Sequence, residues 1–137
     1  MDRALSSQGQ AEAEAAGHWL KQHNFVPDRI IASPARRTRE TLEQVLLALG
    51  YVEQRQDARI FEATPGTLIQ VADEHRDLDR VMLVGHNPGL EQLAALLSSG
   101  QSGEFRGMPA GAIAVLHLQA EAVLEPGAAK LAAFWWP

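Results

Sequence analysis

The sequence predicts an α/β domain in which a mostly parallel sheet lies between two layers of helices. Two short apolar runs, residues 30–32 and 81–84, have the length and composition of strands buried on both faces. Apolar residues at helical spacing follow each run over about ten to fifteen positions, and this alternation is typical of parallel strands joined by crossover helices. Because 137 residues is the size of one domain, residues 1–137 are expected to form a single unit.

Helix start signals set the order of the elements. Ser33 and Thr64 each precede a proline, which pairs a good N-cap with a residue favoured in the first helical turn. Ser7 and Gln10 have the spacing of a capping box, and Asn87 also precedes a proline. We therefore expect, in chain order, a helix over 7–23, a strand over 30–32, a helix over 33–50, a weak strand within 51–59 leading into residues 60–61, a helix over 64–75, a strand over 81–84, a helix over 87–99, a loop over 100–111, and strands over 112–118 and 130–136.

Composition excludes several classes of protein. The net charge of −5 disfavours general binding to nucleic acid, whose phosphates it would repel. No apolar run approaches the roughly 20 residues that span a bilayer. The absence of cysteine rules out a disulfide framework and a thiolate zinc site. The first residues lack the apolar core of a signal peptide, so we expect a cytoplasmic protein without nucleic-acid or membrane partners.

Three arginines crowd the predicted start of the helix that follows residues 30–32. Arg36, Arg37 and Arg39 lie where the helix dipole is positive, so a bound anion would relieve their repulsion. Backbone N–H groups at a helix start, together with guanidinium groups, form a phosphate site. For Arg36 and Arg39 we favour the more ordinary role of exposure to solvent or pairing with Glu40 and Glu43. Arg37 is the candidate phosphate ligand.

His86 follows the strand predicted over 81–84, as Arg37 follows the strand over 30–32. If the strands are parallel, both junctions lie at the carboxyl edge of the sheet, and the two side chains converge on one pocket. Histidine beside arginine, without cysteine or a carboxylate cluster, favours phosphoryl chemistry over metal binding, and we expect neither a metal nor a cofactor. Surface or packing roles are expected for the remaining histidines, His18, His23, His75 and His117.

Two motifs carry this site: Ser33-Pro34-x-x-Arg37-x-x-x-Thr41 and Gly85-His86-Asn87-Pro88-Gly89. In this order and spacing, the chain resembles the histidine phosphatase superfamily of the phosphoglycerate-mutase-like fold. More narrowly, it resembles the SixA-type phosphohistidine phosphatases. The resemblance covers nearly the whole chain. Further matching segments are residues 2–6 with Gly9 at the start of the first helix, the acidic segment 61–65, and the late strands within 105–118 and 131–134.

The resemblance implies a three-layer α/β/α fold and a phosphatase reaction of the EC 3.1.3 class in two steps. In that family a histidine near the N-terminus attacks phosphorus, and water then discharges the phosphohistidine intermediate. By position, Arg37 matches the arginine that binds the phosphate, and His86 matches the second histidine of the pocket, which holds the phosphoryl oxygens. Glu62 falls where many members place a proton donor, although a phosphoramidate leaving group is basic enough to do without one. The resemblance also leads us to expect that Asn87 offers its backbone N–H to phosphate.

The sequence departs from the family at its beginning. The defining Arg-His-Gly or Arg-His-Ala motif ends a first strand, and residues 1–137 contain neither the motif nor a predicted strand before the first helix. We therefore expect a domain that is N-terminally truncated relative to the family, without its first strand and nucleophilic histidine. Little or no phosphatase activity is expected from this chain alone. A degenerate relative that binds without turnover is the alternative.

The favoured function, in the complete parent, is hydrolysis of phosphohistidine on a protein such as a histidine phosphotransfer-type domain. A phosphatase for small phosphorylated metabolites is a rival with the same fold. The short chain without insertions weakens this rival, because it favours an open pocket suited to a protein substrate. A non-catalytic phosphate-binding or interaction module is the rival from another class.

Overall fold

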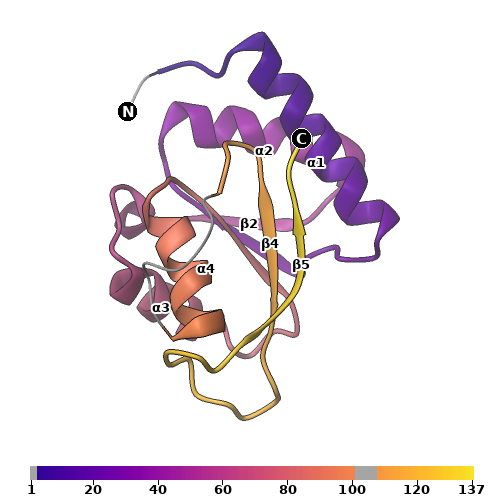
Figure 1. The fold of residues 1–137 in the computed structure, drawn as a ribbon. Coiled ribbons are helices and arrows are strands. Elements are labelled where there is room, and N and C mark those ends of the chain that lie inside the picture. Colours follow the sequence, from indigo (N-terminus) through magenta and orange to yellow (C-terminus); the bar gives the residue numbers. More distant parts are fainter. Residues whose placement is uncertain (1–2, 101–107) are drawn as a thin grey trace.

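The structure has three layers, with two helices on each side of a central parallel sheet (Figure 1). This computed structural model describes residues 3–100 and 108–137. The elements are α1 (Ser7–Gln22), β1 (Arg29–Ala32), α2 (Arg36–Leu49), β2 (Glu53–Gln56), the 3₁₀ turn η1 (Ala58–Ile60), α3 (Pro65–Asp73), β3 (Val81–Val84), α4 (Gly89–Ser99), β4 (Ile113–His117) and β5 (Lys130–Trp135). The predicted α/β class with a parallel central sheet is confirmed. Within the described ranges, no helix is long and apolar enough to cross a membrane.

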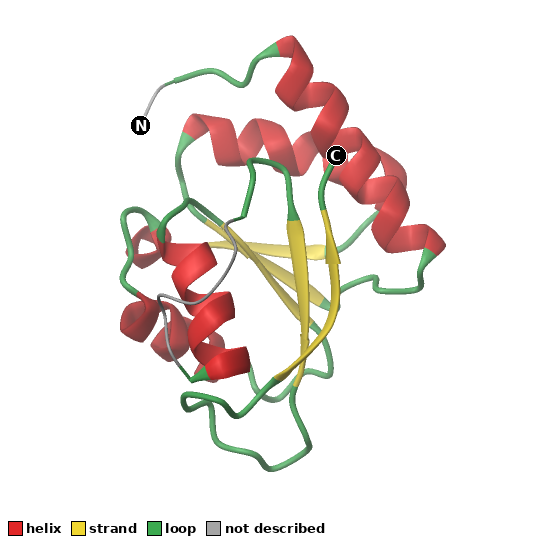
Figure 2. Ribbon diagram, in the orientation of Figure 1, coloured by secondary structure: helices red, strands yellow, loops and turns green. Residues whose placement is uncertain are grey.

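β1 is the middle strand of the parallel sheet, whose order is β2-β1-β3. The strands end in register, because Ala32 at the end of β1 pairs with Gln56 of β2 and with Val84 of β3. The ladder continues one residue further, since the Ser33 N–H donates to the Val84 carbonyl at 3.0 Å. β4 and β5 form a separate antiparallel pair (Figure 2). The chain therefore leaves β1, β2 and β3 at one common edge.

Two hydrophobic clusters fill the spaces between the layers. Ile30 of β1 belongs to the cluster under α1 and α2, and its neighbour Ile31 belongs to the cluster under η1, α3 and α4. Successive strand residues point to opposite faces, so β1 is buried on both sides, as its apolar run predicted. β3 is different: all four of its residues are partly exposed, which corrects the prediction of a fully buried strand. Within the described residues β3 has a ladder partner on one edge only, which leaves its other edge less covered.

α1 begins at Ser7 as predicted, but two helices begin later than predicted: α2 at Arg36 instead of residue 33, and α4 at Gly89 instead of residue 87. α1 is capped by Ser6, whose Oγ accepts the Gly9 N–H at 3.0 Å, and not by Ser7. α2 begins at Arg36 after Ala35, which provides no side-chain cap, so Ser33 is not the N-cap. The Ser33 hydroxyl lies before the helix and is engaged elsewhere, as described below. The prediction for α3 is confirmed, because Thr64 is the N-cap with Pro65 in the first turn.

The remaining boundaries differ in detail. The weak strand expected within 51–59 is β2, a polar edge strand, and the chain enters Ile60 through the turn η1 instead of a continued strand. Ionic contacts hold this edge: Arg29 binds Glu53 at 2.8 Å, and Arg59 binds both Asp57 and Glu74 at 2.7 Å. The late strands are present as β4 and β5. Most of the expected loop over 100–111, with positions 105–107 of the late matching segment, lies outside the described residues.

Gly17 of α1 lies directly against α2, and its substitution tests the packing of the two helices. A Cβ at this position would lie 2.6 Å from the Val45 carbonyl oxygen. We expect Gly17→Ala to lower the free energy of unfolding by about 1–2 kcal/mol. Overpacking costs about 1–3 kcal/mol, whereas alanine gains only about 1 kcal/mol over glycine in a helix. Urea unfolding measures the change.

The matched control is Gly66→Ala in the first turn of α3. A Cβ there meets nothing closer than the Thr64 Oγ1 at 4.0 Å, so this variant should be as stable as the wild type or slightly more so. Equal stability of Gly17→Ala and wild type would contradict the tight contact between α1 and α2.

Candidate active site

A small cavity of about 130 Å³ lies at the carboxyl edge of the sheet, where β1 and β3 end. It has roughly the volume of four water molecules, which is enough for a small oxyanion. The lining residues come from four separate segments and are Arg3, Ala35, Arg37, Phe61 and His86. The structure thus brings Arg37 and His86, which follow different strands, to the wall of one cavity.

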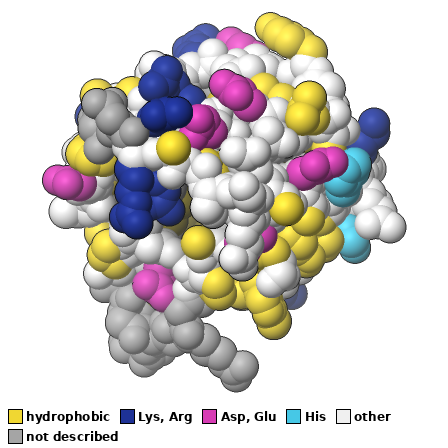
Figure 3. Space-filling model, turned by 90° about the horizontal axis from the view of Figure 1, so that it is seen from above, with side chains coloured by type: hydrophobic (Ala, Val, Ile, Leu, Met, Phe, Trp, Pro, Cys, Tyr) yellow, Lys and Arg dark blue, Asp and Glu magenta, His cyan; other side chains and the backbone are white. Residues whose placement is uncertain are grey.

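The start of α2 makes one wall of the cavity positive. Ala35 gives no side-chain cap, so the N–H groups of the first turn have no side-chain acceptor there. Arg36 is neutralised by Glu40, with Nε and Oε2 at 3.3 Å, in agreement with the ordinary role predicted for it. For Arg37 and Arg3, no carboxylate partner is found in the described part of the chain. Seen from the top of Figure 1, Lys and Arg side chains gather on one side of the molecule (Figure 3).

Arg3 is a site residue that the sequence did not indicate. The segment that carries it is tied to α2, because the Leu5 N–H donates to Glu40 Oε1 at 2.7 Å. This hydrogen bond is the main reason why the pKa of Glu40 lies below its usual value, with Arg36 adding to the effect. Glu40 therefore connects the N-terminal segment to the cationic helix start. A single arginine before a helix carries no sequence pattern from which its position at this cavity could be predicted.

His86 is half-buried and held from two sides. Its Nε2 lies 2.9 Å from the Oγ of Ser33, a residue with no exposed surface. The ring of Phe61 meets it edge-on, with centroids 5.3 Å apart and planes at 89°. Burial and, after it, the charge of Arg37 lower the pKa of His86, while Glu62 acts in the opposite direction. His86 is therefore neutral near pH 7 and can donate a hydrogen bond without carrying charge.

The two other predicted site residues lie at the margin of the cavity. Glu62 is exposed, has a φ of 56°, and is not among the lining residues. Asn87 is also exposed; its side chain donates to the Met108 carbonyl and accepts the Glu91 N–H at 3.1 Å. The proton-donor role of Glu62 and the phosphate contact of the Asn87 backbone stay predictions.

The other histidines lie away from the cavity. His18 and His23 are exposed at α1, and His117 is exposed at the end of β4. His75 is buried, with its Nδ1 3.0 Å from a guanidinium nitrogen of Arg29, which gives it a packing role. In the described ranges, no three side chains of His, Cys, Asp or Glu are grouped as metal ligands would be.

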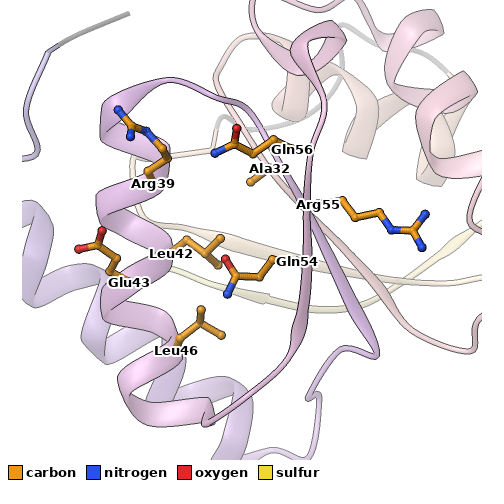
Figure 4. Close-up of a pocket in the computed structure, with 8 residues that line it drawn as sticks. All are labelled: Ala32, Arg39, Leu42, Glu43, Leu46, Gln54, Arg55 and Gln56. Atoms are coloured by element: carbon orange, nitrogen blue, oxygen red, sulfur yellow. The ribbon is translucent and has the colours of Figure 1, made fainter.

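A larger groove of about 270 Å³ runs between α2 and β2 (Figure 4). Leu42 and Leu46 of the helix face Gln54 and Gln56 of the strand across it, while Arg55 points away from the helix. No histidine lines this groove. Besides aliphatic and amide groups, Arg39 and Glu43 of α2 line it, but neither of the residues predicted to bind phosphate, Arg37 and His86, does so. We therefore take the smaller cavity, which Arg37 and His86 share, as the candidate active site.

Arg37→Ala tests the cationic wall. A lost hydrogen bond to a charged ligand costs about 1.5–3 kcal/mol, so the Kd for inorganic phosphate should rise by roughly 10- to 150-fold. Isothermal titration calorimetry measures the change. Arg36→Ala is the control, because Arg36 is paired with Glu40 and does not line the cavity. Unchanged binding by Arg37→Ala would mean that phosphate binds elsewhere.

The lowered pKa of His86 predicts a pH dependence of stability. The unfolded chain has the ordinary pKa of 6.5, so on acidification it takes up the proton before the folded state does. Stability is therefore unaffected at higher pH, falls as the pH drops through 6.5, and levels off below the folded pKa. Urea unfolding should show the free energy of wild type minus that of His86→Gln decreasing between about pH 8 and about pH 5. Parallel curves for the two proteins would contradict this.

Known sequences resemble this chain along almost its whole length. Residues 1–77 match the sequence profile of the histidine phosphatase superfamily (branch 1). An uncharacterized protein of Mycobacterium tuberculosis (strain H37Rv) is 32% identical over 145 residues, which cover 99% of this chain and 90% of the relative. An uncharacterized chloroplastic protein of Arabidopsis thaliana is 31% identical over 108 residues, 71% of this chain and 50% of the relative.

Solved structures give the same result. The protein of Agrobacterium tumefaciens assigned as phosphohistidine phosphatase SixA superposes with a TM-score of 0.83 at 27% identity, over 99% of this chain and 84% of that one. The fold is also that of the protein histidine phosphatase SixA complexed with tungstate, with a TM-score of 0.84 at 23% identity over 99% and 85% of the two chains. The profile match, the full-length relatives and these superpositions agree with the cavity at the sheet edge: the chain belongs to the histidine phosphatase superfamily and has the SixA-type, phosphoglycerate-mutase-like fold.

Proposed function

We propose that this domain, in a longer form that also carries a nucleophilic histidine, removes phosphate from phosphohistidine on proteins. This is a specific form of the phosphatase-type function that the family supports. The observation that carries the proposal is the shared cavity of Arg37 and His86. A guanidinium group neutralises phosphate oxygens and a neutral imidazole donates a hydrogen bond to them, so both stabilise the charge of a transferring phosphoryl group. Arg3 and Arg37 are exposed, so the cavity opens at the surface and accepts a phosphorylated side chain of a protein.

The nucleophile belongs to the same proposal. None of the described histidines except His86 lines the cavity, and His86 is engaged with Ser33. We propose that a histidine in a segment preceding residue 1 of a longer form attacks phosphorus, so that its N–P bond forms as the bond to the substrate nitrogen breaks. Water then attacks the phosphohistidine and releases inorganic phosphate. Residues 1–137 alone would bind phosphate without turnover.

A non-catalytic phosphate-binding module is the second candidate. Two points favour this candidate. Among the described histidines only His86 lines the cavity, and Arg37 together with His86 could bind an anion without a nucleophile. A phosphatase for small metabolites would use the same residues on a different leaving group. The substrate and the upstream sequence therefore decide among the three functions.

The test compares residues 1–137 with a form extended upstream through the next in-frame Arg-His codon pair. Each is assayed with a ³²P-labelled phosphohistidine protein and with p-nitrophenyl phosphate. We expect both forms to bind phosphate and only the extended form to hydrolyse the protein substrate. In that form Arg37→Ala should lower kcat/KM roughly 10- to 150-fold, whereas Arg36→Ala should not.

Other outcomes would assign a different function. Phosphate binding without turnover in both forms would indicate the binding module. Faster hydrolysis of p-nitrophenyl phosphate than of the phosphoprotein would indicate a small-molecule phosphatase. Turnover of the protein substrate by residues 1–137 alone would place the nucleophile within this chain and overturn the proposal of an upstream histidine.

A further inference from the structure

The Ser33 hydroxyl has two partners and no access to solvent. Ser33 is fully buried, and its Oγ lies 3.3 Å from the Ala35 backbone nitrogen and 2.9 Å from His86 Nε2. The Ala35 N–H can only donate, so Ser33 Oγ accepts this hydrogen bond. The hydroxyl proton needs an acceptor of its own, because a buried donor without a partner is unfavourable. Of the two contacts, His86 Nε2 alone can accept it.

This assignment fixes the position of the proton on His86. If Nε2 accepts from Ser33, a neutral imidazole carries its proton on Nδ1. Nδ1 has no hydrogen-bond partner in the described part of the chain, where every buried side-chain nitrogen and oxygen atom is partnered. Nδ1 is therefore accessible from solvent, on a ring that lines the cavity beside Arg37.

We propose that Ser33 is a positioning residue for His86: its hydroxyl donates to Nε2 and holds the imidazole as the neutral Nδ1–H tautomer, which offers a hydrogen-bond donor to an anion in the cavity. The identity of that anion as phosphate rests on the proposed function. The tautomer itself does not, because it follows from contacts within the protein.

The other protonation states leave a buried group unpaired. With the proton on Nε2, Ser33 Oγ would accept from two donors and its own proton would have no acceptor. A doubly protonated ring creates the same conflict and adds a charge beside Arg37. The lowered pKa of His86, caused by burial and then by Arg37, agrees with a neutral ring.

The backbone holds Ser33 in place for this role. Its N–H extends the ladder between β1 and β3 by donating to the Val84 carbonyl at 3.0 Å, two residues before His86. The Oγ–Nε2 contact therefore joins two points that the sheet already fixes. Because α2 begins only at Arg36, the hydroxyl is not used as a helix cap and is available to His86.

The direct test is a long-range ¹H–¹⁵N correlation spectrum of the histidine rings in the 137-residue protein, at neutral pH without phosphate. His86→Gln identifies the signals of His86. We expect the wild type to carry the proton on Nδ1. Ser33→Ala should shift the ring toward a mixture that includes the Nε2–H form, and Ser33→Thr should retain the wild-type pattern. A proton on Nε2 in the wild type, a doubly protonated ring, or a spectrum unchanged by Ser33→Ala would overturn the inference.

Ser98→Ala is the matched control, since its hydroxyl donates to the Ala94 carbonyl within α4, away from the cavity. This variant should leave the His86 signals unchanged. Circular dichroism melting checks that each variant is folded. Should Ser33→Ala or Ser33→Thr not fold, the wild-type spectrum decides alone, because it reports the tautomer without any substitution.

Calorimetry with inorganic phosphate separates this inference from the proposed function. Ser33→Ala should raise the Kd roughly three- to tenfold, as expected for one misdirected hydrogen bond, and Ser98→Ala should not. If the wild type binds no phosphate but shows the Ser33-dependent Nδ1–H form, the proposed function fails and the inference stands. If phosphate binds while His86 carries its proton on Nε2, the inference fails and the proposed function stands.

Discussion

The register between β1 and β3 is the constraint on which the site depends. Ala32 pairs with Val84, and the next backbone hydrogen bond joins Ser33 to Val84, so the two chains leave the sheet side by side. A shift by one residue would turn the side chains of either strand to the opposite face. The register therefore brings Ser33 and His86, which are 53 residues apart in sequence, to 2.9 Å. Arg37 lies four residues after Ser33, in the first turn of α2, and lines the same cavity.

Close backbone packing completes the cavity on its other side. A Cβ at Gly85 would lie 2.6 Å from Ile60 Cγ2, and a Cβ at Gly89 would lie 2.5 Å from the Ala63 carbonyl oxygen. The turn after β3 therefore packs against η1 and the segment that follows it at two positions where only glycine avoids a close contact. This fit brings Phe61 edge-on against His86, so an aromatic wall faces the cationic one. The glycines of the second motif thus act through packing as well as through the turn that they permit.

The sequence predicted most of this fold because its elements have local signals. Burial of β1 on both faces leaves an apolar run, and the Thr64-Pro65 pair marks the start of α3. The same kind of local reasoning selected Arg37 and His86, which follow predicted strands. The Ser33–His86 contact and the place of Arg3 were not predicted, because they depend on strand register and on a tertiary hydrogen bond, Leu5 to Glu40. Serine before proline is a usual cap pattern, so the sequence predicts a helix cap at Ser33. In the structure its hydroxyl instead contacts the imidazole of His86, 53 residues further along the chain.

Arg37 and His86, which both line this cavity, differ in how strongly water reaches them. Arg37 is exposed, so dissolved ions weaken its attraction for an anion over a distance of about 8 Å at physiological ionic strength. His86 is half-buried and neutral, and its contribution is directional and largely insensitive to dissolved ions. If an oxyanion binds there as proposed, concentrated salt would weaken its attraction to Arg37, while a hydrogen bond from the imidazole would still orient it.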